Sequence, residues 1–303
     1  MARSLIKNKI KRGQYLFYIS FVTLPLLQFC IFYLGVNINS FVLAFRKYDI
    51  LTGYSFAGFE NFKRVFYDLG HTLYLKSALK NSVVLYLLSL CITTPLTLIF
   101  SFYIYKKMFF SGFIKVVLFL PTMLSSLIVV LLFKYFTDRA LPNLWESLTG
   151  HKIAGLISDT KTALPTLMFF AVWSGFGSSI LLYLGAMNGI SESLFEAAKI
   201  DGASTFREFW NIVLPQVFPT LSVYLVTGVG GFFTNQMALY SFYGTDAEYT
   251  LYTLGYFLYR GIKVAETVDY PYFSAMGLVL TAVAIPLTYL MRFMLDKFGP
   301  QAD

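Results

Sequence analysis

The stretch NGISESLFEAAKIDGASTFREFWNIVLP, residues 188–215, connects an apolar block that ends near Met187 to another that begins near Val213. Asp201-Gly202 in its middle predicts a sharp turn, because glycine adopts positive φ angles without strain. On either side of this turn, charged and apolar residues alternate with the period of a helix. The stretch therefore predicts two short helices joined by a turn and held between two apolar segments.

Each short helix has a predicted start. Ser193 followed by Glu196, and Thr205 followed by Glu208, have the spacing of a capping box, in which the hydroxyl and the carboxylate satisfy backbone amides at the helix start. The expected apolar side of the pair consists of Leu194, Phe195, Ala198 and Phe206. Such a helix–turn–helix has the shape of a docking element, although the local pattern alone also fits a plain connection between two spans.

The rest of the chain is strongly apolar. Of 303 residues, 57% are apolar and 13% charged, whereas soluble domains carry about 25% charged residues. A helix needs about 20 mostly apolar residues to cross a bilayer. Six stretches meet this requirement: Tyr15–Phe45, Ser82–Tyr105, Gly112–Phe136, Ala163–Met187, Val213–Leu239 and Phe273–Leu295. The blocks are continuous rather than alternating, which disfavours a transmembrane β-barrel.

The predicted fold class is therefore an all-α membrane protein with six transmembrane helices. One domain is expected over residues 15–303, preceded by a basic segment over residues 1–14 that contains five basic and no acidic residues. Basic residues concentrate on the cytoplasmic side of membrane proteins, so both termini are expected in the cytoplasm. The net charge of +8 is spread thinly between apolar blocks and does not indicate a nucleic-acid partner; the basic segment is expected to contact anionic lipid.

One motif within residues 188–212 resembles a known family. Glu196-Ala-Ala, the Asp201-Gly-Ala triplet and Ile212-x-Leu-Pro215, at these offsets, resemble the EAA loop of binding-protein-dependent ABC importer permeases. The resemblance implies the type I importer permease fold, a location in the bacterial plasma membrane, and a cytoplasmic coupling loop that docks on an ATPase. It assigns the coupling role to six residues: Glu196, Ala197, Ala198, Asp201, Gly202 and Ala203.

Other stretches are similar to the sugar-type branch of these permeases, including the maltose, glycerol-phosphate and multisugar types. They are 56–66 in the first outer connection, 173–176 in the fourth span, and 252–261 before the last span. The chain departs from that branch after the fifth span, where Thr234-Asn235-Gln236 stands in place of the common aromatic–Asp pair. This departure bears on the identity of the sugar rather than on the branch.

The resemblance implies a set of partners. A second homologous permease would complete a heterodimeric pore, two ATPase subunits would lie beneath it, and an extracellular sugar-binding protein would deliver the substrate. The chain has no Gly-x-x-x-x-Gly-Lys-Ser/Thr motif, so ATP and Mg²⁺ are expected on the partner ATPase, and no cofactor is expected on this chain. The outer segments 138–161 and 246–270 are expected to contact the binding protein.

Polar residues inside the apolar blocks are candidates for the substrate pathway, because a polar group in lipid is costly and usually faces a bundle interior. In the fifth span these are Thr227, Asn235 and Gln236, and in the fourth they are Trp173, Ser174 and Ser178. Hydrogen bonding between helices without any ligand is the alternative explanation for each of them.

Three other functions were weighed. A gradient-driven carrier or channel predicts ionisable residues near the centres of the spans, and the six blocks contain essentially none. A membrane-embedded enzyme predicts clustered His, Asp or Cys, whereas the two cysteines, Cys30 and Cys91, lie in separate blocks and the two histidines are distant from each other. An ABC importer for a solute other than sugar remains open, because such importers share the EAA loop.

Overall fold

The computed structural model describes residues 2–300. Most side chains of the predicted basic segment 1–14 lie outside that description. The chain divides into two compact units. Unit 1 comprises residues up to Tyr67 together with Ala265–Val279, and unit 2 comprises Asp68–Val264 together with the residues from Leu280 onward. Each unit is described separately.

Unit 1 begins with one long helical run and continues into a hairpin. The run consists of α1 (Ala2–Gln28), a π-helical segment η1 (Phe29–Gly35) and α2 (Val36–Ala44), of which Phe17–Ala44 is apolar enough to span a membrane. The run is longer than one crossing needs. Strands β1 (Arg46–Asp49) and β2 (Gly53–Phe56) then pair antiparallel, and α3 (Glu60–His71) begins within this unit.

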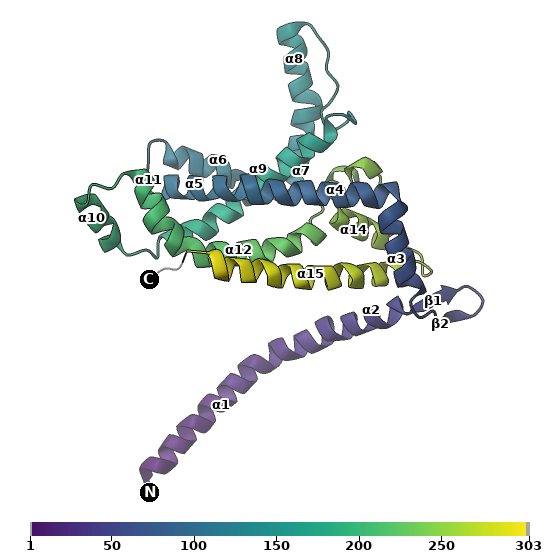
Figure 1. Cartoon of the computed structure of the whole chain (residues 1–303), viewed down its shortest axis with the longest axis horizontal. Coiled ribbons are helices and arrows are strands. Elements are labelled where there is room, and N and C mark those ends of the chain that lie inside the picture. The colour runs from purple at the N-terminus through teal and green to yellow at the C-terminus, as the bar shows by residue number, and fades with distance from the viewer. Residues whose placement is uncertain (1, 301–303) are drawn as a thin grey trace. The chain divides into compact units, whose positions relative to one another are not determined.

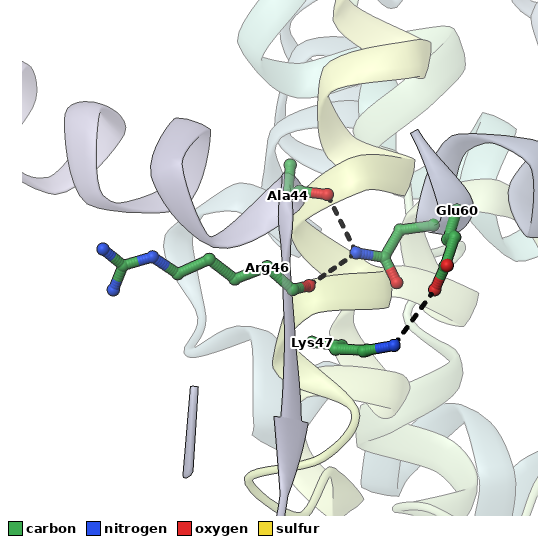
Figure 2. Close-up of polar contacts among 5 residues, drawn as sticks. Ala44, Arg46, Lys47 and Glu60 are labelled. Carbon is green, nitrogen blue, oxygen red and sulfur yellow. Dashed lines mark hydrogen bonds and ion pairs between the residues drawn. The ribbon is translucent and has the colours of Figure 1, made fainter. Parts of the chain in front are cut away.

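The hairpin was not predicted from the sequence, and polar contacts hold its base. Figure 2 shows two hydrogen bonds that end on the carbonyl oxygens of Ala44 and Arg46, and both are donated by Asn61 Nδ2, at 2.9 and 2.7 Å. Lys47 Nζ also lies 3.7 Å from a carboxylate oxygen of Glu60. At the turn, the Asp49 carboxylate accepts hydrogen bonds from the backbone amides of Leu51 and Thr52, and these bonds lower the pKa of the carboxyl.

Unit 2 contains most of the helices. In chain order they are α4 (Leu73–Leu88), η2 (Ser89–Thr93), α5 (Thr94–Tyr105), α6 (Ser111–Met123), α7 (Ser126–Tyr135), η3 (Phe136–Ala140), α8 (Leu141–Thr149), α9 (Ala163–Met187), α10 (Glu192–Ile200), α11 (Thr205–Glu208), η4 (Phe209–Val213), α12 (Leu214–Thr234), α13 (Leu239–Tyr243), η5 (Tyr249–Leu251), α14 (Leu254–Val264) and the later part of α15 (Tyr270–Phe298). In Figure 1, α10 and α11 lie at the end of unit 2 where α5 finishes, and α14 lies at the end where α4 begins.

The membrane-spanning segments largely agree with the prediction. Within residues 2–300 five helical runs are long and apolar enough to span, and the bent pair Ser111–Met123 and Ser126–Thr149 is a sixth if it counts as one span. The predicted fourth span, Ala163–Met187, has the same bounds as α9.

The predicted third span, Gly112–Phe136, is a broken helix rather than a continuous one. The chain bends by 108° between α6 and α7. Pro121 removes a backbone donor near the end of α6, and Leu124 and Ser125 then take extended conformations, so the helix stops and a new one starts at Ser126.

Close approach of backbones fixes part of the packing in unit 2. A Cβ at Gly177 of α9 would lie 2.4 Å from Thr122 Cγ2 of α6 and 3.1 Å from the Leu118 carbonyl oxygen. Only glycine therefore permits this crossing. Next to it, Ile104, Phe119, Phe176 and Ile180 form a buried apolar cluster.

Candidate coupling loop and polar cavity

The loop over residues 188–212 folds as the two predicted short helices, but they start at other residues. Helix α10 begins at Glu192 with Ser191 as its N-cap residue, and the Ser193 hydroxyl contacts that of Ser191 at 2.7 Å. Helix α11 has Ser204 as its N-cap residue, and its hydroxyl accepts a hydrogen bond from the Arg207 amide at 3.4 Å. Both predicted capping boxes are therefore wrong, because a serine one or two residues earlier takes the N-cap position.

The turn between the two helices agrees with the prediction. Gly202 has φ +67°, in the left-handed region. Its amide donates to the Lys199 carbonyl oxygen at 3.1 Å, and the Ala203 amide donates to that of Ala198 at 2.9 Å. This pair of bonds is the Schellman motif, which closes a helix when the residue after its C-cap adopts the left-handed conformation. Gly202 therefore ends α10 and sets the direction of α11.

The six residues predicted to couple transport to the ATPase divide by exposure. Glu196, Ala197, Asp201 and Gly202 are exposed, Ala203 is half-buried, and Ala198 is buried against the bundle. The loop thus presents one side of α10 and its turn to solvent at the end of unit 2 (Figure 1). Of the four residues predicted to form the apolar side, Phe195 and Ala198 are buried, whereas Leu194 and Phe206 are 40% and 72% exposed.

An anchor cluster attaches the loop to the spans. It consists of Leu98, Phe102, Tyr183, Met187, Ile190, Phe195, Val213, Val217 and Leu221. Phe195 from α10 packs beside Tyr105 with ring centroids 5.8 Å apart, and Phe209 packs beside Phe102 at 5.2 Å. Buried apolar side chains of this size each contribute about 1.5–3 kcal/mol, so displacing the loop from the ends of α5 and α9 has a high cost.

A polar contact in the same region was missed from the sequence. Glu208, predicted as a capping residue, is 5% exposed, and a carboxylate oxygen lies 2.5 Å from Lys106 Nζ. Lys106 follows the end of α5, about one hundred positions earlier in the chain. No local spacing rule connects the two, and the buried position of Glu208 emerges only when α11 packs on α5.

A polar cavity lies between α4 and α12. It has a volume of about 260 Å³ and brings together Ser82, Leu85, Tyr86, Ser89, Tyr224, Thr227, Gly228, Gly231, Phe232 and Asn235. Two of the predicted pathway residues, Thr227 and Asn235, thus line one cavity. Tyr86 also lines the cavity and was not predicted from the sequence; its buried hydroxyl has no hydrogen-bond partner among the described residues. The wall offers hydroxyl, amide and aromatic groups together.

Asn235 and Gln236 lie within the apolar run Thr205–Tyr243, as predicted, but at a break in its helix. Helix α12 ends at Thr234, and Asn235 is extended, with φ −69° and ψ 120°. Its side-chain oxygen accepts a hydrogen bond from the Met237 amide at 2.8 Å, and its carbonyl oxygen accepts one from Thr253 Oγ1 at 2.8 Å. Asn235 therefore closes the end of α12 while it also lines the cavity.

The three candidates on α9 lie elsewhere. Trp173 stacks against Phe133 with ring centroids 6.0 Å apart and lines a separate apolar cavity of about 360 Å³. The Ser174 hydroxyl donates to the Ala171 carbonyl oxygen at 3.4 Å, and Ser178 is exposed. The structure does not bring these residues to the cavity between α4 and α12.

Two buried residues of α4 hold the segment that follows α13. Asn81 Nδ2 donates to the carbonyl oxygens of Thr250 and Tyr252 at 2.8 and 2.9 Å, and the Ser82 hydroxyl accepts from the Leu254 amide at 2.9 Å. These bonds bind the start of α14 to α4, next to the polar cavity. No local pattern in the sequence predicts these bonds, because their partners are about 170 positions away.

Comparison with known proteins identifies the family. Residues 93–302 match the model of the family described as the binding-protein-dependent transport system inner membrane component. The chain belongs to this family. Membership confirms the predicted type of protein, a permease of the inner membrane that acts as a non-catalytic subunit of a transport system. The match covers the coupling loop, the α12 wall of the polar cavity and the last span.

Relatives of this permease have carbohydrate systems in their names. It is 28% identical over 296 residues to the polygalacturonan/rhamnogalacturonan transport system permease protein YteP of Bacillus subtilis, covering 93% of this chain and 89% of that protein. It is 27% identical to the arabinooligosaccharides transport system permease protein AraP of the same organism, covering 95% and 90%.

A solved structure supports the fold. A bacterial ABC transporter involved in the import of the acidic polysaccharide alginate has a chain that superposes with a TM-score of 0.78. It is 22% identical in sequence, and the match covers 97% of this permease and 99% of that chain. The predicted permease fold is thus confirmed.

Proposed function

We propose that this permease forms one half of the membrane pathway of an ATP-driven importer of a carbohydrate, an oligosaccharide or a related sugar. The observation that carries the proposal is the coupling loop, closed by Gly202 in the left-handed conformation and anchored to two spans by buried aromatic rings. The carbohydrate systems in the names of its relatives support the substrate class.

The loop is suited to dock on an ATPase. Glu196, Ala197 and Asp201 face outward, and the small alanine permits close approach of another surface. The anchor cluster below them transmits a displacement of α10 to the ends of α5 and α9 rather than absorbing it. ATP binding and hydrolysis then bias the bundle between two states, as an allosteric coupling requires. ATP and Mg²⁺ are held by the ATPase partner, two copies of which lie on the cytoplasmic side.

The cavity between α4 and α12 is suited to hold a sugar unit in passage. A sugar is bound by hydrogen bonds to its hydroxyls and by contact with aromatic faces, and Tyr86, Thr227 and Asn235 offer both. The buried Tyr86 hydroxyl, which has no partner among the described residues, is available to a substrate hydroxyl. The cavity has a volume of about 260 Å³. It forms one side of a site that a second permease completes.

The remaining parts follow from this assignment. Both termini lie in the cytoplasm, with the coupling loop on the same side. The outer segments 138–161 and 246–270 meet an extracellular sugar-binding protein. Hydrogen bonds fix the conformation of the first of these segments. In it, the Asp138 carboxylate accepts from Ile157 N, Ser158 N and Ser158 Oγ at 2.8–3.2 Å.

Co-purification of the tagged chain from its native membrane, with identification of every protein recovered, tests this proposal. We expect a second permease, an ATPase with a phosphate-binding loop and a sugar-binding protein. Recovery of this chain alone or as a homo-oligomer under mild detergent, without an ATPase, would contradict it.

A further inference from the structure

The Lys106–Glu208 contact is a buried ion pair at the base of the coupling loop. The two side chains are 20% and 6% exposed, and their charged atoms are 2.5 Å apart. The same ammonium lies 4.4 Å from the centre of the Phe195 ring, within the range of a cation–π contact. One cation therefore contacts α10 through Phe195 and α11 through Glu208, while its own backbone ends α5.

The positions of both residues on their helices favour their charges. Lys106 is the C-cap residue of α5, and Glu208 lies in the first turn of α11. A cation at a helix C-terminus and an anion at an N-terminus are each stabilised by the helix dipole. The pair thus joins the two helix ends electrostatically as well as by direct contact.

The two joined helices are long. Helix α5 ends a run over Leu73–Tyr105, and α11 begins a run that continues through η4 and α12. These runs provide both walls of the polar cavity, since Tyr86 belongs to the first and Thr227 to the second. A change at the pair therefore acts on the ends of both walls.

We propose that Lys106 and Glu208 are positioning residues that carry the displacement of the coupling loop to the two helices around the substrate cavity. The proposal rests on the proposed function of the permease. Neither residue belongs to the EAA motif. Their pairing makes α5, α10 and α11 move as one body when the ATPases close. Neutralising one partner leaves the other charge buried without compensation, which is strongly disfavoured, and releases the three helices from one another.

The test uses the complete transporter in proteoliposomes, with substrate moved and ATP hydrolysed both measured. Lys106→Met and Glu208→Gln are expected to lower the substrate moved per ATP by about fivefold or more, the lower end of typical allosteric couplings. Lys106→Arg, which keeps the charge, is expected to retain the ratio. The double variant Lys106→Met with Glu208→Gln is expected to stay within about twofold of the lower of the two single variants, because both side chains act through one contact.

A matched control is the ion pair Arg292–Asp296. Its Nε and Oδ2 atoms are 3.7 Å apart, and both side chains are 70% exposed. Arg292→Met is expected to leave the ratio unchanged. The inference is overturned if the single variants assemble and keep the wild-type ratio, or if the double variant loses as much as the two single losses multiplied together. If the single variants fail to assemble, the double variant, which leaves no buried charge unpaired, is measured alone, and a wild-type ratio in it overturns the inference. Absence of ATP-driven uptake by the wild-type complex would instead overturn the proposed function itself.

Discussion

Replacement of Gly202 tests how strictly the turn of the coupling loop controls transport. A Cβ added at Gly202 meets nothing within 4 Å, so the cost of a side chain is conformational rather than steric. An alanine held at φ +67° costs about 1–2 kcal/mol relative to its preferred conformations. This lowers the population of the closed Schellman turn by a factor of about 5–30. Asparagine tolerates the left-handed conformation better than alanine, so Gly202→Asn is expected to lose less than Gly202→Ala.

Hydrogen exchange measures this effect directly. The amides of Gly202 and Ala203 donate the two bonds of the turn, and in Gly202→Ala we expect their protection to fall by a factor of about 5–30. The substrate moved per ATP in proteoliposomes should fall in the same order, glycine above asparagine above alanine. Gly185 within α9 is the control, because its added Cβ also meets nothing within 4 Å and its φ is helical. Gly185→Ala is expected to be neutral or stabilising by up to about 1 kcal/mol. Equal protection in wild type and Gly202→Ala would refute the reasoning.

Three further variants test the bundle and the cavity. Asn81→Ala removes both hydrogen bonds that Asn81 donates to the segment that follows α13, and it is expected to destabilise that segment by about 1–3 kcal/mol. Limited proteolysis of residues 245–256 should then be faster, and proteolysis at the wild-type rate would argue against these bonds. Gly177→Val forces α6 and α9 apart and is expected to cost about 1–3 kcal/mol in the thermal unfolding of the complex, whereas Gly175→Ala, at a site with open space, should leave its Tm in place. Thr227→Val keeps the shape of the cavity wall but removes a hydroxyl, and it is expected to raise the KM for uptake by about fivefold or more without changing the amount of complex; an unchanged KM would remove Thr227 from the pathway.

Features that depend on neighbours in the sequence were predictable. The bounds of α9 follow from the length of its apolar block, and the left-handed turn at Gly202 follows from the short helix before it. The type of protein followed from the spacing of the EAA motif together with the apolar blocks. The helix starts in the loop were less certain, because Ser191, Ser193, Ser204 and Thr205 are all acceptable N-cap residues, and packing selects among them.

Features that depend on distant partners were not predictable. Glu208 is a suitable capping residue by its local spacing, but the approach of α5 places Lys106 beside it and buries both. Asn235 lies in a stretch that is apolar enough to span a membrane, but helix α12 ends at Thr234. Asn235 closes this helix end by accepting hydrogen bonds from Met237 and Thr253. The bend that follows Pro121 was not predictable from the proline alone, since many membrane helices contain proline without breaking.

The most direct test of the account is uptake of a labelled oligosaccharide into proteoliposomes that contain the complete transporter. The account predicts uptake that requires ATP on the side of the coupling loop and a binding protein on the opposite side, and that continues when ion gradients are collapsed. Uptake that proceeds without ATP and stops when the gradients are collapsed would contradict it.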